Sequence, residues 1–510
     1  MPEVFPSILW CGKLGATGDA EASQEIFDVR FWPHESPDGN SVFALVGGRN
    51  VSQTPEKSEI IAHGKQVFVC RTKLNADPPF EITRWWRDAD PARSLNSICW
   101  TQDHHGRPLL CAAGLMPKSI LIYDVEHDKV ARTISGHGKA INDLQTCPTK
   151  PSVIASASED YTVRLWNLDA KYEKQPCIAI LAGQGHKQPL LALAFHPNGR
   201  WLLSSAMDTA IALWAIPTEA EVNEAYARDQ EPLLVTYPAF ITEEVHFNFV
   251  DSLDWYGDLI LSRAARGSND KSVRNEILLW QIDGFDSDAP APAKPAVPYP
   301  GLYTRSAFHH TPESRGFHRL LTFKTDHTSR FYHRFGFLHR PETNTRPILV
   351  MGTEESKYLF WDLQRCEEGE EPGEYPRPTR GAKSVRGRPK KLRGGASALD
   401  RLGGLRRESS VASSEGTGPP NTSSPSPNNT LAAPTSTSVS NAAVTPGGRR
   451  FMLDDPFTPL KPHLEVLADT TLSSREHFAT NQLSWSADGK WLVGTGDRGM
   501  ITVFYREQVA

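Results

Sequence analysis

Cysteine is scarce in this chain of 510 residues, and its few thiols are not arranged in pairs. The seven cysteines are an odd number, lie far apart and include no Cys-x-x-Cys motif; they are Cys11, Cys70, Cys99, Cys111, Cys147, Cys177 and Cys366. This spacing argues against a disulfide framework and against a zinc finger, and it favours a reducing compartment.

Long apolar runs and catalytic motifs are also missing. No stretch approaches the roughly 18 apolar residues of a membrane-spanning helix, and the N-terminal MPEVFPSILW lacks the features of a signal peptide. The sequence has no Gly-x-Ser-x-Gly, no phosphate-binding loop and no His-Glu-x-x-His, and its histidines lack metal-ligand spacing. We therefore expect a cytosolic or nuclear protein that is not an enzyme, with no membrane contact, metal or cofactor.

The net charge is small, −5 at pH 7, but it is unevenly distributed. The stretch 377–407 holds eleven Lys or Arg and one acidic residue, so the rest of the chain is clearly acidic. The sequence SSPSPNNTLAAPTSTSVS that follows is of low complexity. Such a composition cannot bury enough apolar surface to fold alone, and we predict a disordered insertion over residues 366–450.

Two segments repeat one pattern at a spacing of 48 or 49 residues: GHGKAINDLQTCPTKPSVIASASEDYTVRLWNL and GHKQPLLALAFHPNGRWLLSSAMDTAIALWAI. This is the Gly-His…Trp-Asp pattern of WD repeats, each of which forms one four-stranded blade. The matching positions are His137, Ser156, Asp160 and Trp166 in the first repeat and His186, Ser204, Asp208 and Trp214 in the second. We assign them a structural role, because these side chains can form a buried hydrogen-bond chain within one blade.

Weaker copies indicate five further blades, which open near Phe27, Leu95, Val245, Phe331 and Phe478. Seven blades close a ring with short, protected strand edges, so the predicted fold class is all-β, a seven-bladed WD40 β-propeller. We place blades one to six in residues 1–365, the insertion between blades six and seven, and blade seven in residues 451–510. Residues 5–11 should supply the outer strand of blade seven, and residues 217–237 a short surface helix.

One position recurs four residues before the core residue that ends each innermost strand. It is occupied by Phe27, Asn96, Asn142, Leu191, Asp251, Phe331 and Asn481. Equivalent positions at the start of these strands lie around one mouth of the central channel. Phe27 and Phe331, with Tyr332 next to it, are thus candidates to converge, and aromatic faces around a hollow bind a quaternary ammonium by cation–π attraction. The alternative is that these rings only pack within the propeller.

The two repeats, together with HFNFVDSLDWYGDLILS, resemble the extra sex combs/EED family, the WD-repeat subunit of Polycomb repressive complex two. The resemblance implies a nuclear, non-enzymatic protein that binds the N-terminal helix of a SET-domain histone methyltransferase on one face of the propeller, alongside other Polycomb subunits. On the opposite face it implies an aromatic cage for a trimethylated histone H3 tail, whose binding stimulates the methyltransferase and supports gene silencing.

The methyl-lysine cage of that family falls here on Phe27, Asn96, Phe331 and Tyr332. Three of the four positions remain aromatic. Asn96 departs from the pattern, because the family has Tyr there, and Trp85 or Trp86 in the preceding loop is a candidate for the missing wall.

The basic stretch contains VRGRPKK, which is similar to the AT-hook core; the matching residues are Arg386, Gly387, Arg388 and Pro389. In that motif the two arginines lie along the narrow minor groove of A·T-rich DNA, where the negative potential is deepest. A nuclear-import signal or a plain basic tract is the alternative.

A different WD scaffold, such as the substrate receptor of a ubiquitin ligase, is the alternative function. Such receptors often carry Trp-Asp-x-Arg at the end of a blade. Here Trp361 and Asp362 are followed by Arg365, one residue late, which counts against that interpretation.

Overall fold

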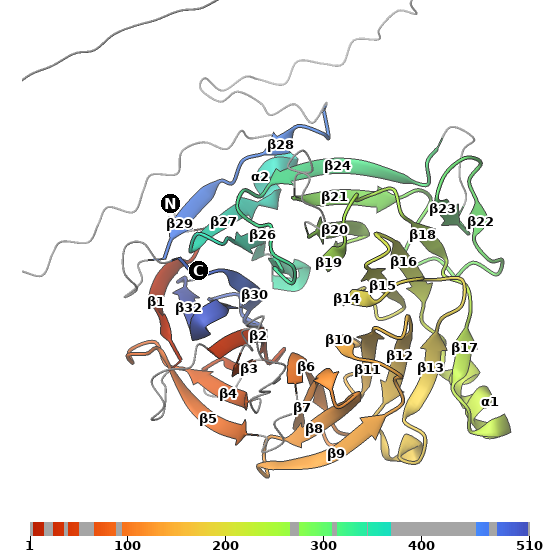
Figure 1. The fold of residues 1–510 in the computed structure, drawn as a ribbon, viewed down its shortest axis with the longest axis horizontal. Helices are drawn as coiled ribbons and strands as arrows, with labels where there is room; N and C mark the ends of the chain where they lie inside the picture. Colours follow the sequence, from red (N-terminus) through yellow and green to blue (C-terminus); the bar gives the residue numbers. More distant parts are fainter. Residues whose placement is uncertain are drawn as a thin grey trace, which may run out of the picture. The chain divides into compact units, whose positions relative to one another are not determined.

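The structure is a computed structural model of the chain and describes residues 4–14, 24–34, 39–49, 66–87, 94–265, 275–308, 314–343, 345–368, 455–468 and 477–507. These residues belong to one compact unit. Their strands form seven sheets that stand around a central opening like the blades of a propeller (Figure 1). The predicted all-β, seven-bladed fold is therefore confirmed.

The first four blades follow one another along the chain, and each begins with its innermost strand. Blade one contains β2 (Gln24–Phe31), β3 (Val42–Arg49), β4 (Gln66–Thr72) and β5 (Phe80–Arg87). Blade two contains β6 (Ser94–Gln102), β7 (Pro108–Met116), β8 (Ser119–Asp124) and β9 (Lys129–Ser135). Blade three contains β10 (Ile141–Thr146), β11 (Val153–Ser158), β12 (Val163–Asn167) and β13 (Cys177–Leu181). Blade four contains β14 (Leu190–Phe195), β15 (Trp201–Ala206), β16 (Ile211–Ala215) and β18 (Phe240–Thr242).

The remaining three blades complete the ring. Blade five contains β19 (Val250–Tyr256), β20 (Leu259–Ala264), β21 (Glu276–Ile282) and β24 (Phe317–Lys324). Blade six contains β25 (Gly336–Arg340), β26 (Thr345–Gly352), β27 (Lys357–Asp362) and β29 (Leu464–Leu467). Blade seven contains β30 (Thr480–Trp485), β31 (Trp491–Gly496), β32 (Met500–Tyr505) and β1 (Ser7–Lys13). The antiparallel pairing of β1 with β32 confirms the predicted closure of the ring by the N-terminal segment.

Additional strands lie at the outer edges of three blades. β17 (Leu233–Val235) runs parallel to β13, β28 (Pro459–Leu460) runs parallel to β24, and β22 (Val297–Pro298) and β23 (Thr304–Ser306) extend blade four. The predicted surface helix is α1 (Glu219–Asp229), which opens with a capping box of Thr218 and Glu221. The other helices are α2 (Leu363–Glu368) and the 3-10 helices η1 (Ala170–Tyr172), η2 (Pro341–Thr343) and η3 (Asp497–Gly499). In the described part of the chain, no helix is both long and apolar enough to cross a membrane.

The position of the insertion differs in detail from the sequence-based boundary. β27 is the third strand of blade six, and its outer partner β29 follows the insertion, so residues 464–467 belong to blade six and not to blade seven. A four-residue strand gives too short an alternation to be found from sequence. Residues 369–454, including Arg386, Gly387, Arg388 and Pro389, lie outside the described residues, so their predicted disorder and DNA contact remain predictions.

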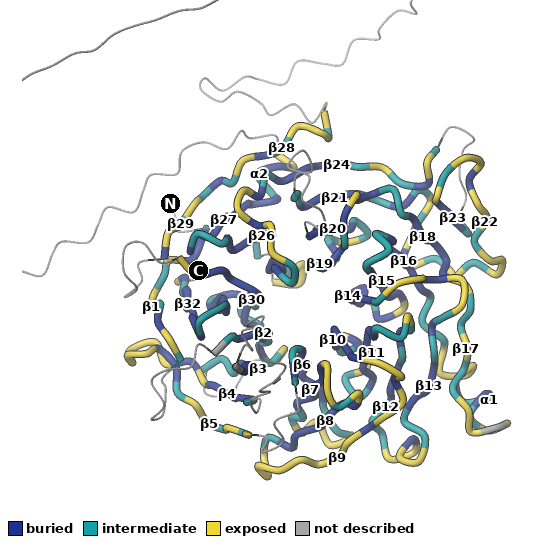
Figure 2. Tube along the Cα trace, in the orientation of Figure 1, coloured by how far each residue is buried: buried dark blue, intermediate teal, exposed yellow. Residues whose placement is uncertain are grey.

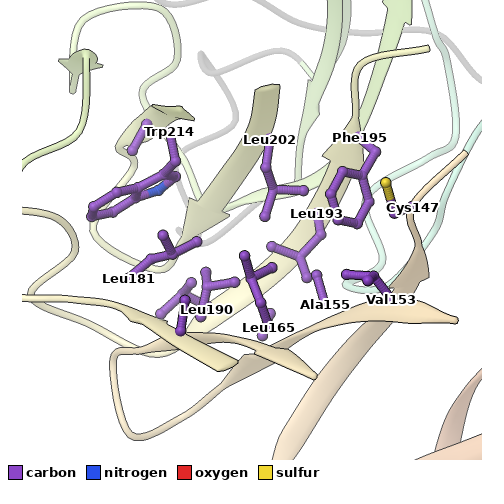
Figure 3. Packing of buried hydrophobic residues seen from close by; sticks show 14 of the residues in the cluster. Cys147, Val153, Ala155, Leu165, Leu181, Leu190, Leu193, Phe195, Leu202 and Trp214 are labelled. Atoms are coloured by element: carbon purple, nitrogen blue, oxygen red, sulfur yellow. The ribbon is translucent and has the colours of Figure 1, made fainter. Parts of the chain in front are cut away.

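The hydrophobic core lies between the blades rather than within one layer. Inner and middle strands are buried on both faces because each blade is covered by two neighbours, while the rim is exposed (Figure 2). Figure 3 shows the interface of blades three and four, where Ala155 and Leu165 pack against Leu193 and Leu202. This arrangement makes each blade depend on the next one, so the ring holds its channel-facing residues in fixed positions.

Candidate functional site

The WD positions of blades three and four form two similar buried hydrogen-bond chains. In blade three, the ring of His137 contacts Asp160 at 2.9 Å and Ser156 Oγ at 2.6 Å, and the Trp166 indole donates to the same Oγ at 2.8 Å. In blade four, His186 contacts Asp208 at 3.2 Å and Ser204 at 2.8 Å, and Trp214 donates to Ser204 at 2.8 Å. Burial lowers the pKa of His137, and Asp160 opposes that shift. All eight residues bond within their own blades.

A third chain of this kind was missed by the sequence analysis. In blade five, His246 contacts Ser262 Oγ at 2.7 Å, and Trp280 donates to the same oxygen at 2.9 Å. Ser262 and Trp280 are 18 positions apart, against 10 in blades three and four, because more residues separate β20 from β21 than separate the matching strands there. A search for His, Ser and Trp that allowed for this longer spacing would have found it.

The recurring channel position is a β-bulge in six of the seven innermost strands. In β2, for example, Ile26 lies opposite Gly47 and Asp28 opposite Val46, so Phe27 is the bulged residue. Matching shifts occur at Asn96, Asn142, Leu191, Asp251 and Asn481. A bulge turns its side chain away from the regular alternation. Asn142 and Asn481 thereby donate to backbone carbonyls of the next blade, and Asp251 pairs with Arg263 within blade five.

Blade six departs from the predicted register. Phe337 pairs with Leu349, which in turn pairs with Trp361. Phe195 of blade four pairs in the same way with Leu202 and Trp214, so Phe337 rather than Phe335 stands in the core row. The residue four places before it is His333, and the backbone N–H of the next residue, Arg334, donates to the carbonyl of the bulged Asn481 at 2.8 Å. Phe331 and Tyr332 therefore lie in the turn that enters β25, and not in the innermost strand.

A hydrogen-bonded network links the segments that carry the four cage positions. Asp28, next to Phe27, lies 3.4 Å from the Ser97 hydroxyl, and Ser97 follows Asn96. The same hydroxyl is 3.4 Å from Asp143. Asp143 in turn accepts a hydrogen bond at 2.8 Å from Arg334, two residues after Tyr332. The segments from blades one, two and six thus meet at one level of the channel.

Arg334 is the centre of this network. Its guanidinium also donates to the carbonyl of Leu191 in blade four at 2.8 Å, and only 9% of the residue is exposed. Burial would lower its pKa, but the charges of Asp143 and Asp28 outweigh that effect and raise the pKa, so Arg334 stays charged. Its guanidinium carbon lies 5.8 Å from the centre of the Tyr332 ring. The sequence analysis did not single out Arg334, although a basic residue two positions after an aromatic pair was a usable signal.

The aromatic pair lies at the surface end of this network. The rings of Phe331 and Tyr332 are 4.3 Å apart, and Phe249 of blade five lies 6.2 Å from Phe331, edge to face. Burial raises the pKa of Tyr332. Phe27 is partly buried against the core between blades one and two. The pair and Phe27 supply three aromatic side chains close to the network.

Asn96 supplies an amide where the other three positions supply rings. Among the described residues, its buried Oδ1 has no hydrogen-bond partner. The two tryptophans suggested as substitutes do not lie in a loop: they belong to β5, the outermost strand of blade one, where Trp85 stacks on Phe68 and Trp86 packs 4.8 Å from Tyr123. They stand three strands away from the channel and do not replace the missing wall.

The channel opens on the opposite face into a cavity of about 440 Å³. Arg30, Asp143 and Arg334 stand at its inner end, and Trp255 and Trp485 are on its walls. Burial raises the pKa of Asp254 in this cavity to about 6. Within the described ranges, no three His, Cys, Asp or Glu side chains gather in a way that would hold a metal ion.

Comparison with known proteins places this geometry in a family. A family model described as "WD domain, G-beta repeat" matches residues 128–167 and 175–215. The Polycomb protein EED of Chaetomium thermophilum is 40% identical over 374 residues, which cover 70% of this chain and 60% of the relative. The Polycomb protein esc of Drosophila melanogaster is 28% identical over 352 residues, 66% of this chain and 70% of the relative. The match thus spans less than two thirds of the first of these relatives.

A solved structure of the Chaetomium thermophilum Polycomb repressive complex 2, in complex with trimethylated histone H3, contains a similar chain. The TM-score is 0.69 at 27% identity, and the match covers 98% of both chains. The repeats, the seven sheets and the hydrogen-bond chains define this protein as a WD-repeat β-propeller. Within that class, it belongs to the EED/extra sex combs family of Polycomb proteins.

Proposed function

We propose that this protein is the non-catalytic WD-repeat scaffold of a Polycomb repressive complex and reads methylated lysine on the histone H3 tail. The single observation that carries the proposal is the meeting of the cage segments of blades one, two and six at one mouth of the channel. It is supported by the identity to a Polycomb protein over most of the propeller.

The chemistry of this mouth suits a trimethylated lysine. Phe27, Phe331 and Tyr332 offer aromatic faces, and each good cation–π contact contributes roughly 0.5–2 kcal/mol. The Arg334 guanidinium is held by Asp143, so its charge is balanced and does not repel a cation at the mouth. A primary ammonium is more strongly hydrated than a trimethylammonium and gains less from the rings.

The opposite face is proposed to bind the N-terminal helix of a SET-domain methyltransferase, which the occupied reader site then stimulates. Other Polycomb subunits and a nuclear location belong to the same proposal, and the basic stretch with Arg386 and Arg388 is proposed to contact A·T-rich DNA. The ubiquitin-ligase alternative is not favoured, because the compared relatives are Polycomb proteins.

Two experiments test the proposal. Co-purification of the full chain from nuclear extract should recover a SET-domain methyltransferase, whereas recovery of a cullin-ligase adaptor would support the other class of scaffold. Calorimetric titration should show that the wild type prefers a trimethylated H3 peptide over the unmethylated one. Phe331→Ala should weaken the trimethylated peptide severalfold or more, as expected for the loss of one cation–π contact. Tyr303→Ala, which removes a ring that is 77% exposed on the rim of blade four, is the control and should leave the affinity unchanged.

A further inference from the structure

The turn that carries Phe331 and Tyr332 needs support from outside itself. Tyr332 has a φ of 58°, in the left-handed region that a bulky L-residue adopts only at a cost. The turn also precedes β25 and therefore has no strand partner of its own. A ring in such a turn keeps one orientation only where neighbouring groups hold the backbone.

Blade five supplies a buried ion pair at this place, next to blade six in the ring (Figure 1). Asp251 is the bulged residue of β19, and Arg263 lies on β20. Both carboxylate oxygens of Asp251 accept hydrogen bonds from Arg263 Nη1, at 2.7 and 2.6 Å. Both side chains are completely buried, so neither charge is balanced by solvent.

The pair holds the turn at several backbone groups. Arg263 Nη2 donates to the carbonyl of Thr328 at 2.5 Å and to that of Arg330 at 3.1 Å. Burial raises the pKa of the Asp251 carboxyl, and on the other side of the aromatic pair the backbone N–H of His333 opposes this larger effect, because it favours the charged form and lowers the pKa. The ion pair therefore holds the chain directly before Phe331 and interacts with it after Tyr332.

A second carboxylate also holds the turn, whereas the buried histidine ring that follows the aromatic pair makes no hydrogen bond within the described part of the chain. His333 is fully buried, and neither of its ring nitrogens has a hydrogen-bond partner among the described residues. Glu354 Oε1 accepts hydrogen bonds from the backbone N–H groups of Ser329 and Arg330 at 2.6 and 3.0 Å. Burying an ion pair is costly unless its hydrogen bonds are satisfied. Here two of the four hydrogen bonds of the Arg263 guanidinium go to Asp251 and two go to the turn, while its Nε has no partner in the described ranges.

We propose that Asp251 and Arg263 are positioning residues of the reader site, which orient Phe331 and Tyr332 without touching the ligand. This inference rests on the proposed reader function. It assigns to blade five a specificity role that the sequence analysis did not give it, since Asp251 was noted only as a polar member of the ring. Loss of the pair should loosen the turn and reduce the discrimination between methylated and unmethylated lysine.

The test compares the full-length wild type with the double variant Asp251→Asn/Arg263→Met, which removes the pair without leaving one charge buried alone. Arg263→Lys is a milder second variant in case the double variant does not fold, because it keeps a positive charge opposite Asp251 and removes the second guanidinium nitrogen that bonds the turn. Ser204→Ala is the control, because it disrupts a buried hydrogen-bond chain in blade four, away from the turn. Calorimetry with trimethylated and unmethylated H3 peptides is run well below the melting temperature of each variant.

We expect the affinity of the double variant for the trimethylated peptide to fall at least about fivefold, the loss expected when two aromatic contacts are misaligned. Arg263→Lys should give a smaller loss in the same direction, and Ser204→Ala should melt earlier but bind normally. Hydrogen exchange should rise in residues 325–335 of the two ion-pair variants only. A wild type that prefers the trimethylated peptide, together with variants that keep that preference, overturns the positioning role alone. A wild type with no preference overturns the reader function as well.

Discussion

The guanidinium of Arg334 in blade six lies 2.8 Å from the carboxylate of Asp143 in blade three, so one ion pair joins two blades that face each other across the channel. Asp143 also accepts a hydrogen bond from the backbone N–H of Leu193 in blade four, at 2.8 Å. The pair separates the aromatic mouth from the cavity on the opposite face. The ion pair therefore stabilises the ring and also forms the floor of the proposed reader site.

Removal of Arg334 alone should be more damaging than removal of the whole pair. Arg334→Met leaves the Asp143 carboxylate buried, and the loss of one partner of a buried pair costs roughly 3–5 kcal/mol of unfolding free energy. The double variant Asp143→Asn/Arg334→Met removes both charges and should recover a large part of that loss. Urea unfolding of both proteins measures the difference. Equal losses would show that the pair contributes little across the channel.

Sequence analysis predicted the blades whose sequence pattern is repeated. It failed in blade six, where the pairing of the strands decides which residue faces the core. His137 and His186 fell at matching positions because the hydrogen-bond chain requires a fixed spacing within a blade. In blade six, Phe335 looked like the core residue, but the pairing of Phe337 with Leu349, opposite Trp361, moves the row by two residues. No residue type indicates this shift, because both positions are Phe.

Long-range polar contacts are the second kind of feature that the sequence analysis did not predict. Arg263 stands in an ordinary strand, and its role depends on Asp251 in the neighbouring strand and on a turn 65 residues later in the sequence. A single sequence contains no signal for such a contact. The recurring strand position already indicated Phe27, Phe331 and Tyr332, and the family resemblance added a cage role for Asn96. That the four side chains form one cage stays a prediction.

Stability should fall on mild acidification because of a histidine that stays neutral in the fold. Burial, together with the charges of Arg319 and Arg263, lowers the pKa of His246 to about 3. The unfolded chain binds a proton at this histidine near pH 6.5, so the neutral His246 costs no stability above that pH. Between about pH 6.5 and pH 3, the free energy of unfolding falls by about 1 kcal/mol per pH unit as the pH is lowered. Urea unfolding from about pH 7.5 to pH 5.5 should show the decline, and His246→Gln should reduce its slope. An unchanged slope would place the acid sensitivity elsewhere.

Deletion of residues 376–448 should leave a cooperatively melting propeller, because every strand of the seven sheets lies outside that stretch. A longer deletion that begins at Cys366 should melt earlier. Cys366 is only 4% exposed, and α2, which contains it, also provides Glu367 as the partner of the Tyr256 hydroxyl. Thermal melting monitored by circular dichroism distinguishes the two. A broad transition after the shorter deletion would show that the segment packs against the blades.

The basic stretch should bind A·T-rich duplex weakly in the full-length protein, with an affinity that falls steeply with salt because phosphate neutralisation drives it. Arg386→Ala together with Arg388→Ala should remove the preference for A·T sequences, since these are the residues expected in the minor groove. Fluorescence anisotropy with A·T-rich and G·C-rich duplexes measures both effects. Equal binding of the wild type to the two duplexes would reduce the motif to a charge patch.

Asn96 should limit how well the proposed cage separates trimethylated from dimethylated lysine. A trimethylammonium has no N–H, whereas a dimethylammonium keeps one, and the Oδ1 of Asn96 is a buried acceptor without a partner among the described residues. Asn96→Tyr replaces this acceptor by an aromatic face, which adds roughly 0.5–2 kcal/mol for a trimethylated lysine. We therefore expect Asn96→Tyr to tighten the trimethylated H3 peptide severalfold and the dimethylated peptide less, so that the ratio of the two dissociation constants changes in favour of the trimethylated form. Calorimetric titration of wild type and variant with both peptides measures that ratio. A variant that binds the two peptides with the wild-type ratio would show that the side chain at position 96 does not face the ligand.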